Sequence, residues 1–176
     1  MADEINSMKI RDLFEVNPIL SGRTEIEAVA TGTGVHGHMY AEEIALSLTP
    51  GASNTYTEIG SSLTGGVTNG VTFQNSKELK VDSAGTYFIN YSISARMQVG
   101  TNTEVHATIM INGTAQSTAT SHITSSSSSD VRFVLAGSTI LTLSASEKIS
   151  LAIKDESGTQ EFIIEDVNCS IIKLSK

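Results

Sequence analysis

The clearest alternation of apolar and polar residues lies at residues 85–94, Gly-Thr-Tyr-Phe-Ile-Asn-Tyr-Ser-Ile-Ser. Side chains two residues apart share one face of an extended strand, so this pattern predicts a strand with one face in a core. Phe88 is the one large apolar residue on the otherwise polar face. The positions expected to face the core are Tyr87, Ile89, Tyr91 and Ile93.

The same period of two continues to the end of the chain, with no helical pattern between the strands. Turn-forming residues separate the strands, and Asn112-Gly113 between two alternating runs is the strongest hairpin signal. Many short strands in this order predict an antiparallel sandwich or jelly roll. The predicted strands are Val71–Asn75, Glu78–Val81, Gly85–Met97, Thr103–Ile111, Gln116–Ile123, Val131–Leu143, Lys148–Ile153 and Phe162–Leu174.

The first 50 residues follow a different pattern. A short strand is predicted over Ile26–Ala30, and the run Val35–Tyr40 is expected to pair back on it as a hairpin. Ala41–Leu48 is predicted to be a helix. It holds good helix formers, acidic residues in its first turn, and Ile44 and Leu48 four residues apart.

These patterns divide the chain into three parts. Residues 1–50 form a small N-terminal module, residues 51–70 a linker with a first strand at Tyr56–Ile59, and residues 71–176 the jelly-roll domain. The predicted fold class is therefore mainly β, a small β/α module followed by an antiparallel jelly-roll β-sandwich. A module of about 50 residues buries little apolar surface alone, which favours an oligomer.

Composition narrows the possible partners. The net charge of −8 argues against nucleic acid, which needs clustered Lys and Arg, and against an anionic membrane surface. The N-terminus has no signal-peptide pattern, and no apolar stretch approaches the length of a membrane span. We therefore expect a protein made in a cytoplasm without membrane insertion. The single cysteine, Cys169, lies in a strand pattern and is expected to pack as a small apolar residue.

The last hundred or so residues resemble the jelly roll of complement-q globular heads and tumour-necrosis-factor ligands. The resemblance begins at Ala84-Gly85-Thr86-Tyr87, whose alternation continues through Ile89 and Tyr91. Further matching segments are Ala107–Gly113, Ala136–Leu143, Glu147–Leu151 and the last strand, Cys169–Leu174. Members of these families are homotrimers, so the resemblance implies a trimeric head.

A second resemblance concerns the N-terminal part. Residues 9–13, residues 20–29 and the predicted helix at Ala41–Leu48 are similar to a small module at the start of bacteriophage fibre and appendage proteins. Together the two resemblances imply a structural virion protein, a trimeric head fibre or capsid decoration that can adhere to host-surface glycans or proteins. They also imply that residues 1–50 are an anchoring and trimerisation module, which would attach the trimer to capsid or tail proteins. The alternatives are a receptor-binding tail-fibre or tail-tip module, and a bacterial surface or spore-coat jelly roll.

The sharpest local motif is His36-Gly37-His38. Two histidines at i and i+2 lie on the same side of a strand. Three copies around a threefold axis would present six imidazoles, enough to coordinate iron or another transition metal. His36 and His38 are therefore a candidate metal site, conditional on that axis. The alternative is a pair of exposed turn histidines.

Other candidate chemistry is weaker. Carboxylates at 155–166 could hold calcium between loops, although they lack the spacing of a calcium-binding loop, and a solvated acidic rim is the preferred interpretation. His106 and His122 lie in strand patterns and serines are abundant, but the sequence has no nucleophile-elbow motif and no phosphate-binding glycine loop. We expect no enzymatic activity, no catalytic residues and no organic cofactor.

Overall fold

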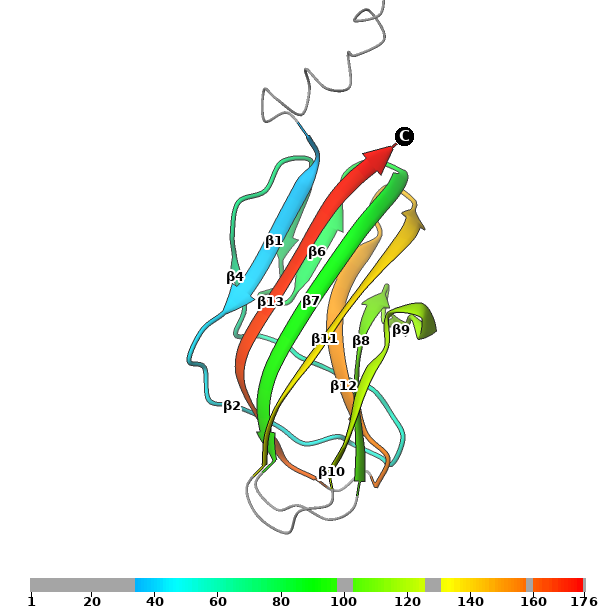
Figure 1. Cartoon of the computed structure of the whole chain (residues 1–176). Coiled ribbons are helices and arrows are strands. Elements are labelled where there is room, and N and C mark those ends of the chain that lie inside the picture. Colours follow the sequence, from blue (N-terminus) through cyan, green and yellow to red (C-terminus); the bar gives the residue numbers. More distant parts are fainter. Residues whose placement is uncertain (1–33, 98–102, 126–130, 158–159, 176) are drawn as a thin grey trace, which may run out of the picture. The chain divides into compact units, whose positions relative to one another are not determined.

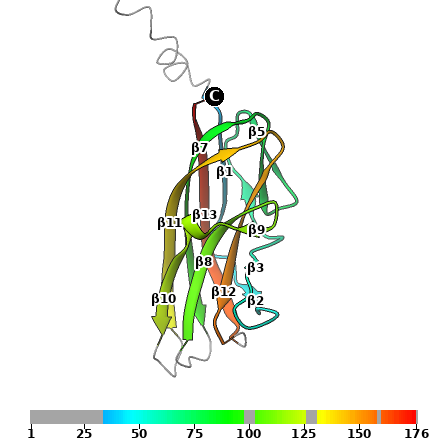
Figure 2. The same ribbon diagram turned by 90° about the vertical axis from the view of Figure 1, so that its right-hand side faces the viewer.

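The structure is a computed structural model that describes residues 34–97, 103–125, 131–157 and 160–175. The strands in these residues form two antiparallel sheets that pack face to face. Figure 1 looks onto one sheet, with β1, β13, β7 and β11 in front, and Figure 2 shows the two layers from the side. This arrangement confirms the predicted mainly β sandwich.

The first sheet has the strand order β11-β7-β13-β1-β4, and β2 also pairs with β13. β7 lies between β11 and β13 and pairs with β11 along its whole length. Its strands are β1 (His36–Ala41), β2 (Leu46–Leu48), β4 (Thr64–Gly65), β7 (Gly85–Met97), β11 (Val131–Leu143) and β13 (Phe162–Ser175).

The second sheet has the strand order β10-β8-β12-β6-β5, with β3 paired to β12 and β9 to β8. Its strands are β3 (Thr57–Glu58), β5 (Val71–Gln74), β6 (Glu78–Val81), β8 (Thr103–Ile111), β9 (Thr114–Ala115), β10 (Ser121–Ser125) and β12 (Lys148–Asp155). Six of the eight strands predicted from residue 71 onward, at 71, 78, 85, 103, 131 and 162, match to within a residue, and the one at 148 extends two residues further.

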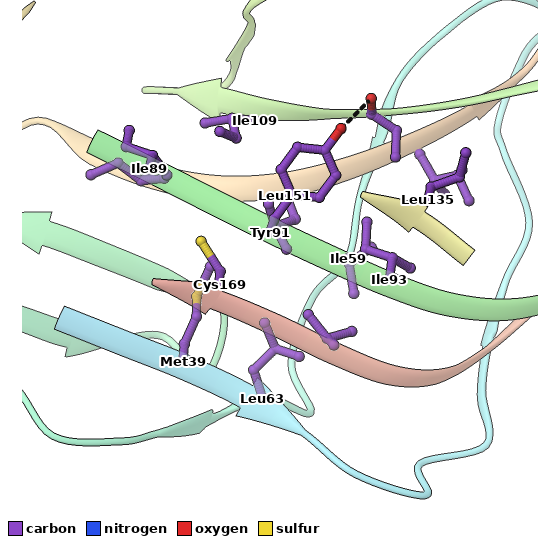
Figure 3. Packing of buried hydrophobic residues seen from close by; sticks show 14 of the residues in the cluster. Met39, Ile59, Leu63, Ile89, Tyr91, Ile93, Ile109, Leu135, Leu151 and Cys169 are labelled. Atoms are coloured by element: carbon purple, nitrogen blue, oxygen red, sulfur yellow. Dashed lines mark hydrogen bonds between the residues drawn. The ribbon is translucent and has the colours of Figure 1, made fainter. Parts of the chain in front are cut away.

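The core lies between the sheets and is built mainly from aliphatic side chains. Along β7 every second residue is buried, as the alternation predicts, and Tyr87, Ile89 and Ile93 are fully buried. Full burial of each large apolar side chain stabilises the fold by about 1.5–3 kcal/mol. Figure 3 shows part of this core, including Met39 from β1 and Cys169 from β13.

Tyr91 adds a polar connection through this apolar layer. Its hydroxyl donates to the carbonyl oxygen of Ala119 at 2.8 Å and lies 3.0 Å from that of Ala107, so β7 is tied to the opposite sheet. Gly137 faces the ring on β11, and a Cβ there would lie 2.8 Å from the Tyr91 ring. Loss of the hydroxyl would leave buried acceptors without this donor, at a cost of about 1–3 kcal/mol.

The prediction of a helix over Ala41–Leu48 is wrong. Glu43 has a φ of 52°, outside the helical region, and Leu46–Leu48 pairs with β13 as β2. Ile44, Leu46 and Leu48 alternate along this segment and pack against the core. Burial with a period of two therefore outweighs the local helix propensity. No helix in the described part of the chain is long and apolar enough to cross a membrane.

The predicted boundaries at residues 50 and 70 also need correction. β1 pairs with the last strand, β13, along its whole length. The segment Ile26–Ala30, its predicted hairpin partner, lies outside the described residues. Residues 51–70 are more than a linker: β3 pairs with the second sheet, β4 pairs with β1, and Ile59 and Leu63 are buried in the core. The sandwich unit begins at Val35.

The hairpin predicted at Asn112-Gly113 is present, and both residues have positive φ, 49° and 79°. This is the backbone geometry for which an Asn-Gly turn is favoured. The strand predicted over Gln116–Ile123 is only partly correct. After β9 the chain leaves the ladder in a 3-10 turn at Ser117–Ala119, and pairing with β8 resumes in β10 at Ser121.

Asp155, at the end of β12, is a fully buried carboxylate. The Ser157 hydroxyl and the backbone N–H of Gln160 donate to its Oδ2 at 2.6 and 3.1 Å, and the Ser157 N–H and the Thr103 hydroxyl donate to Oδ1. Burial alone would raise the pKa of Asp155, but these hydrogen bonds together hold it below its ordinary value. The charged carboxylate therefore fixes the start of β8 to the turn after β12.

We predict that Asp155→Asn lowers the free energy of unfolding by about 1.5–3 kcal/mol at pH 7, the usual loss for hydrogen bonds to a charged group. Because the folded pKa is depressed, the stabilisation is complete above the ordinary Asp pKa of about 3.9 and disappears as pH falls through the folded pKa. Urea unfolding of the wild type and the variant between pH 7 and pH 3 measures this difference. The exposed Asp82→Asn is the control, and a difference that stays constant with pH would contradict the role of the charge.

Candidate functional site

The outer face of the first sheet carries the two histidines of the His36-Gly37-His38 motif and Phe88. Residues from β11, β7, β13 and β1 lie side by side there in rows set by the strand register. The rows change from apolar near the C-terminal end of β13, through Ser and Asn in the middle, to charged near its start. The polarity of this face thus changes along the strands, from apolar at one end to charged at the other.

The apolar end consists of Ile140, Phe88 and Ile172, which are direct neighbours on β11, β7 and β13; we call these three the apolar row. Ile140 and Ile172 are 59% and 50% exposed, and Leu174 beside them is 54% exposed. Four of the five exposed large apolar residues in the described part of the chain lie on β11 and β13. Isolated exposed residues are ordinary, but a continuous set across three strands is typical of a contact surface.

His36 and His38 lie on the same outer side of β1, as their spacing predicts, while Gly37 and Met39 point inward. His36 is in register with Ile172 of the apolar row, and His38 stacks on Tyr40 with ring centroids 5.3 Å apart. Among the described residues, neither histidine belongs to a group of three metal-ligand atoms close enough to share an ion. A metal on this pair would need further ligands, which a threefold arrangement of chains would supply.

An open hollow of about 880 Å³ lies beside His38, on the polar middle of the face. Its lining combines the Tyr40 ring with acidic and amide groups, among them Glu42, Asp166 and Asn168. The backbone N–H of Glu43 donates to Asp166 Oδ1 at 3.0 Å, which holds the segment after β1 over β13. The hollow is thus a polar, anionic depression next to the apolar row.

The charged end of the face is organised by Glu165, at a bulge in the pairing of β13 with β7. Its Oε1 lies 3.4 Å from Arg96 Nε and 3.4 Å from Arg132 Nη2. Arg96 is in register with Arg132 on β11, so the carboxylate separates two like charges. This local neutralisation stabilises the arrangement of the arginines rather than forming an anion site.

The carboxylates considered for calcium do not converge. Asp155 is buried within hydrogen bonds, Glu165 is paired with the arginines, Asp166 accepts from Glu43, and Glu161 accepts from the Ser47 hydroxyl. In the part of the chain that the structure describes, they form no common ligand set. These carboxylates thus take part in separate local contacts, and Asp155 is the buried one among them.

Cys169 packs in the core as predicted, with no exposed surface. Burial raises the pKa of its thiol to about 12, so it stays protonated at neutral pH. Tyr87 and Tyr91 are also core residues, as their alternation predicts.

The structure brings together two residues that sequence patterns left apart. His106 on β8 is directly opposite His122 on β10, and Glu104 lies beside both. A tight Asn112-Gly113 hairpin, continued from the Met110–Ala115 pair, would place His106 opposite Ala119 instead. The 3-10 turn at Ser117–Ala119 shifts the register and creates the histidine pair. No sequence signal specifies how many residues this turn contains.

Among solved structures, the chain is similar to the Eiger tumour necrosis factor of S. frugiperda. The similarity has a TM-score of 0.54 at 12% sequence identity, and it covers 82% of this chain and 94% of that chain. No family model and no curated protein matches the chain. The described residues thus have a tumour-necrosis-factor-like jelly-roll fold.

Proposed function

We propose that the chain is a non-enzymatic structural protein of a bacteriophage virion, a homotrimeric head fibre or capsid decoration. Its jelly-roll heads associate through the outer face of the first sheet. The trimeric state is supported by the resemblance of residues 84–174 to families whose members are trimers. The virion role is supported by the resemblance of residues 9–13 and 20–29, which lie outside the described residues.

The observation that carries the self-association is the apolar row. Ile140, Phe88 and Ile172 form a continuous apolar strip on a chain of net charge −8, where solubility alone would favour polar residues. Covering such a strip with a second copy removes apolar surface from water, which contributes about 25 cal/mol per Å² buried. His36, in register with Ile172, extends the strip to β1.

Adhesion follows from repetition of the head. Three linked copies bind a repeated host-surface glycan or protein with an avidity that exceeds the affinity of each single contact. Such a role needs no catalytic group, in keeping with a surface built for contact. The same trimer would bring His36 and His38 of three chains onto one assembly, where iron or another transition metal could bind if those strands meet at the axis.

We predict that replacing the apolar row with charge dissociates the assembly. Ile140→Asp with Ile172→Asp should shift the protein to monomers at micromolar concentration, because each copy loses the burial of two isoleucines and gains two desolvated carboxylates. Both side chains are at least half exposed in the single chain, so the fold is expected to persist. Sedimentation velocity over a dilution series measures the change.

Val67→Asp is the matched control, since Val67 is 74% exposed and lies after β4, outside the apolar row. It should leave the sedimentation coefficient unchanged. If the row variant sediments like the wild type, the apolar row is not the contact surface.

The virion role predicts that purified phage particles from the source of this sequence contain the chain, detected by peptide mass spectrometry. Gold-labelled antibody against the head should then decorate the capsid. Label at the tail tip would favour the receptor-binding alternative. Presence of the chain only in a cell envelope or spore coat would contradict the proposal.

A further inference from the structure

The outer face of the second sheet carries a cluster that the proposed function does not use. Glu104 and His106 are two residues apart on β8, so both point outward, and His122 faces His106 from the edge strand β10. Glu104 and His106 are half-buried, whereas the His122 side chain is 62% exposed. Glu104 and His106 are thus held by the surrounding protein, whereas the cluster is open to solvent on the side of His122.

The ligand atoms of these three side chains converge. His106 Nε2 lies 3.2 Å from Glu104 Oε1, and His122 Nε2 lies 3.8 Å from the same oxygen. One ligand atom from each residue falls within 4.8 Å of the other two. A tetrahedral ion with bonds of about 2.0–2.1 Å needs ligand atoms roughly 3.3–3.4 Å apart. The described positions are therefore close to that geometry, and the exposed His122 ring can supply the remaining adjustment.

The environment of His106 suits a cation. Its Nε2 is buried and makes no hydrogen bond to any described residue, although two carboxylates face it, Glu104 at 3.2 Å and Glu156 at 3.7 Å. A neutral imidazole is the form that binds metals.

We propose that Glu104, His106 and His122 form a binding site for a divalent transition-metal ion of the zinc class. Two imidazole nitrogens and one carboxylate oxygen are a common zinc ligand set, with water completing the coordination. Glu156, 3.7 Å from His106, is available as an alternative fourth ligand. The site contains no residue of the apolar row and does not depend on a trimer.

A bound ion would hold the edge strand β10 to β8. β10 is the edge strand of the second sheet, and among the described strands of that sheet it pairs only with β8, so a bond between His122 and β8 restrains it. An ion that binds the folded chain and not the unfolded one raises the melting temperature by mass action. Lys154, in register with His106 on β12, opposes the ion by charge.

Titration calorimetry of the full chain with zinc chloride in chelator-free buffer tests the site. The wild type is expected to bind one zinc ion per chain, with a rise in melting temperature. His122→Ala and Glu104→Gln should each weaken binding by more than about tenfold, since even the loss of an outer-shell partner costs 10–100-fold. Lys154→Gln should tighten it.

The double variant His36→Ala/His38→Ala is the matched control, because it removes two histidines from the other sheet. It should bind zinc at this site as the wild type does. Circular dichroism confirms that His122→Ala, a change at an exposed position, remains folded. The proposal is overturned if the wild type binds no zinc, or if His122→Ala and Glu104→Gln bind it as tightly as the wild type.

Discussion

The structure depends on one constraint, that the apolar faces of two sheets must cover each other. β7 lies between β11 and β13 in the first sheet and sends alternate side chains into that layer. Tyr91 crosses it and donates to a carbonyl at Ala119, near the second sheet, in space that Gly137 leaves open. A slip of one residue in register would expose the whole inner set of side chains, so this packing fixes the register.

Both candidate surfaces follow from the same constraint. Once Tyr87, Ile89 and Tyr91 point inward, Phe88 must point outward, where it meets Ile140 and Ile172. On the second sheet the buried set of β8 likewise leaves Glu104 and His106 on the outside. The two surfaces lie on opposite faces of the sandwich, so self-association and metal binding can be tested separately.

The sequence predicted most strands from residue 71 onward because their two faces differ in polarity. It failed where local preference and long-range pairing disagree. Residues 41–48 contain good helix formers, but Ile44, Leu46 and Leu48 alternate and pack on the core, and β2 pairs with β13 far along the chain. The early strands β1 to β4 likewise pair with strands that no local sequence pattern identifies.

The candidate sites were predictable to different degrees. Phe88 broke the alternation and so marked the apolar row, although its neighbours became known only with the strand order. The shared face of His36 and His38 follows from their spacing alone. The cluster around His106 and His122 depends on a register shift made by three residues of 3-10 turn, and short turns of Ser, Thr and Ala leave that length unspecified.

The central claim is that the head is built to assemble with copies of itself. Light scattering coupled to size-exclusion chromatography gives the absolute mass of the full chain in solution. We expect a homotrimer, with three chains of 18.6 kDa each, that persists at low micromolar concentration. A single species with the mass of one chain would contradict it, and the apolar row would then need another partner.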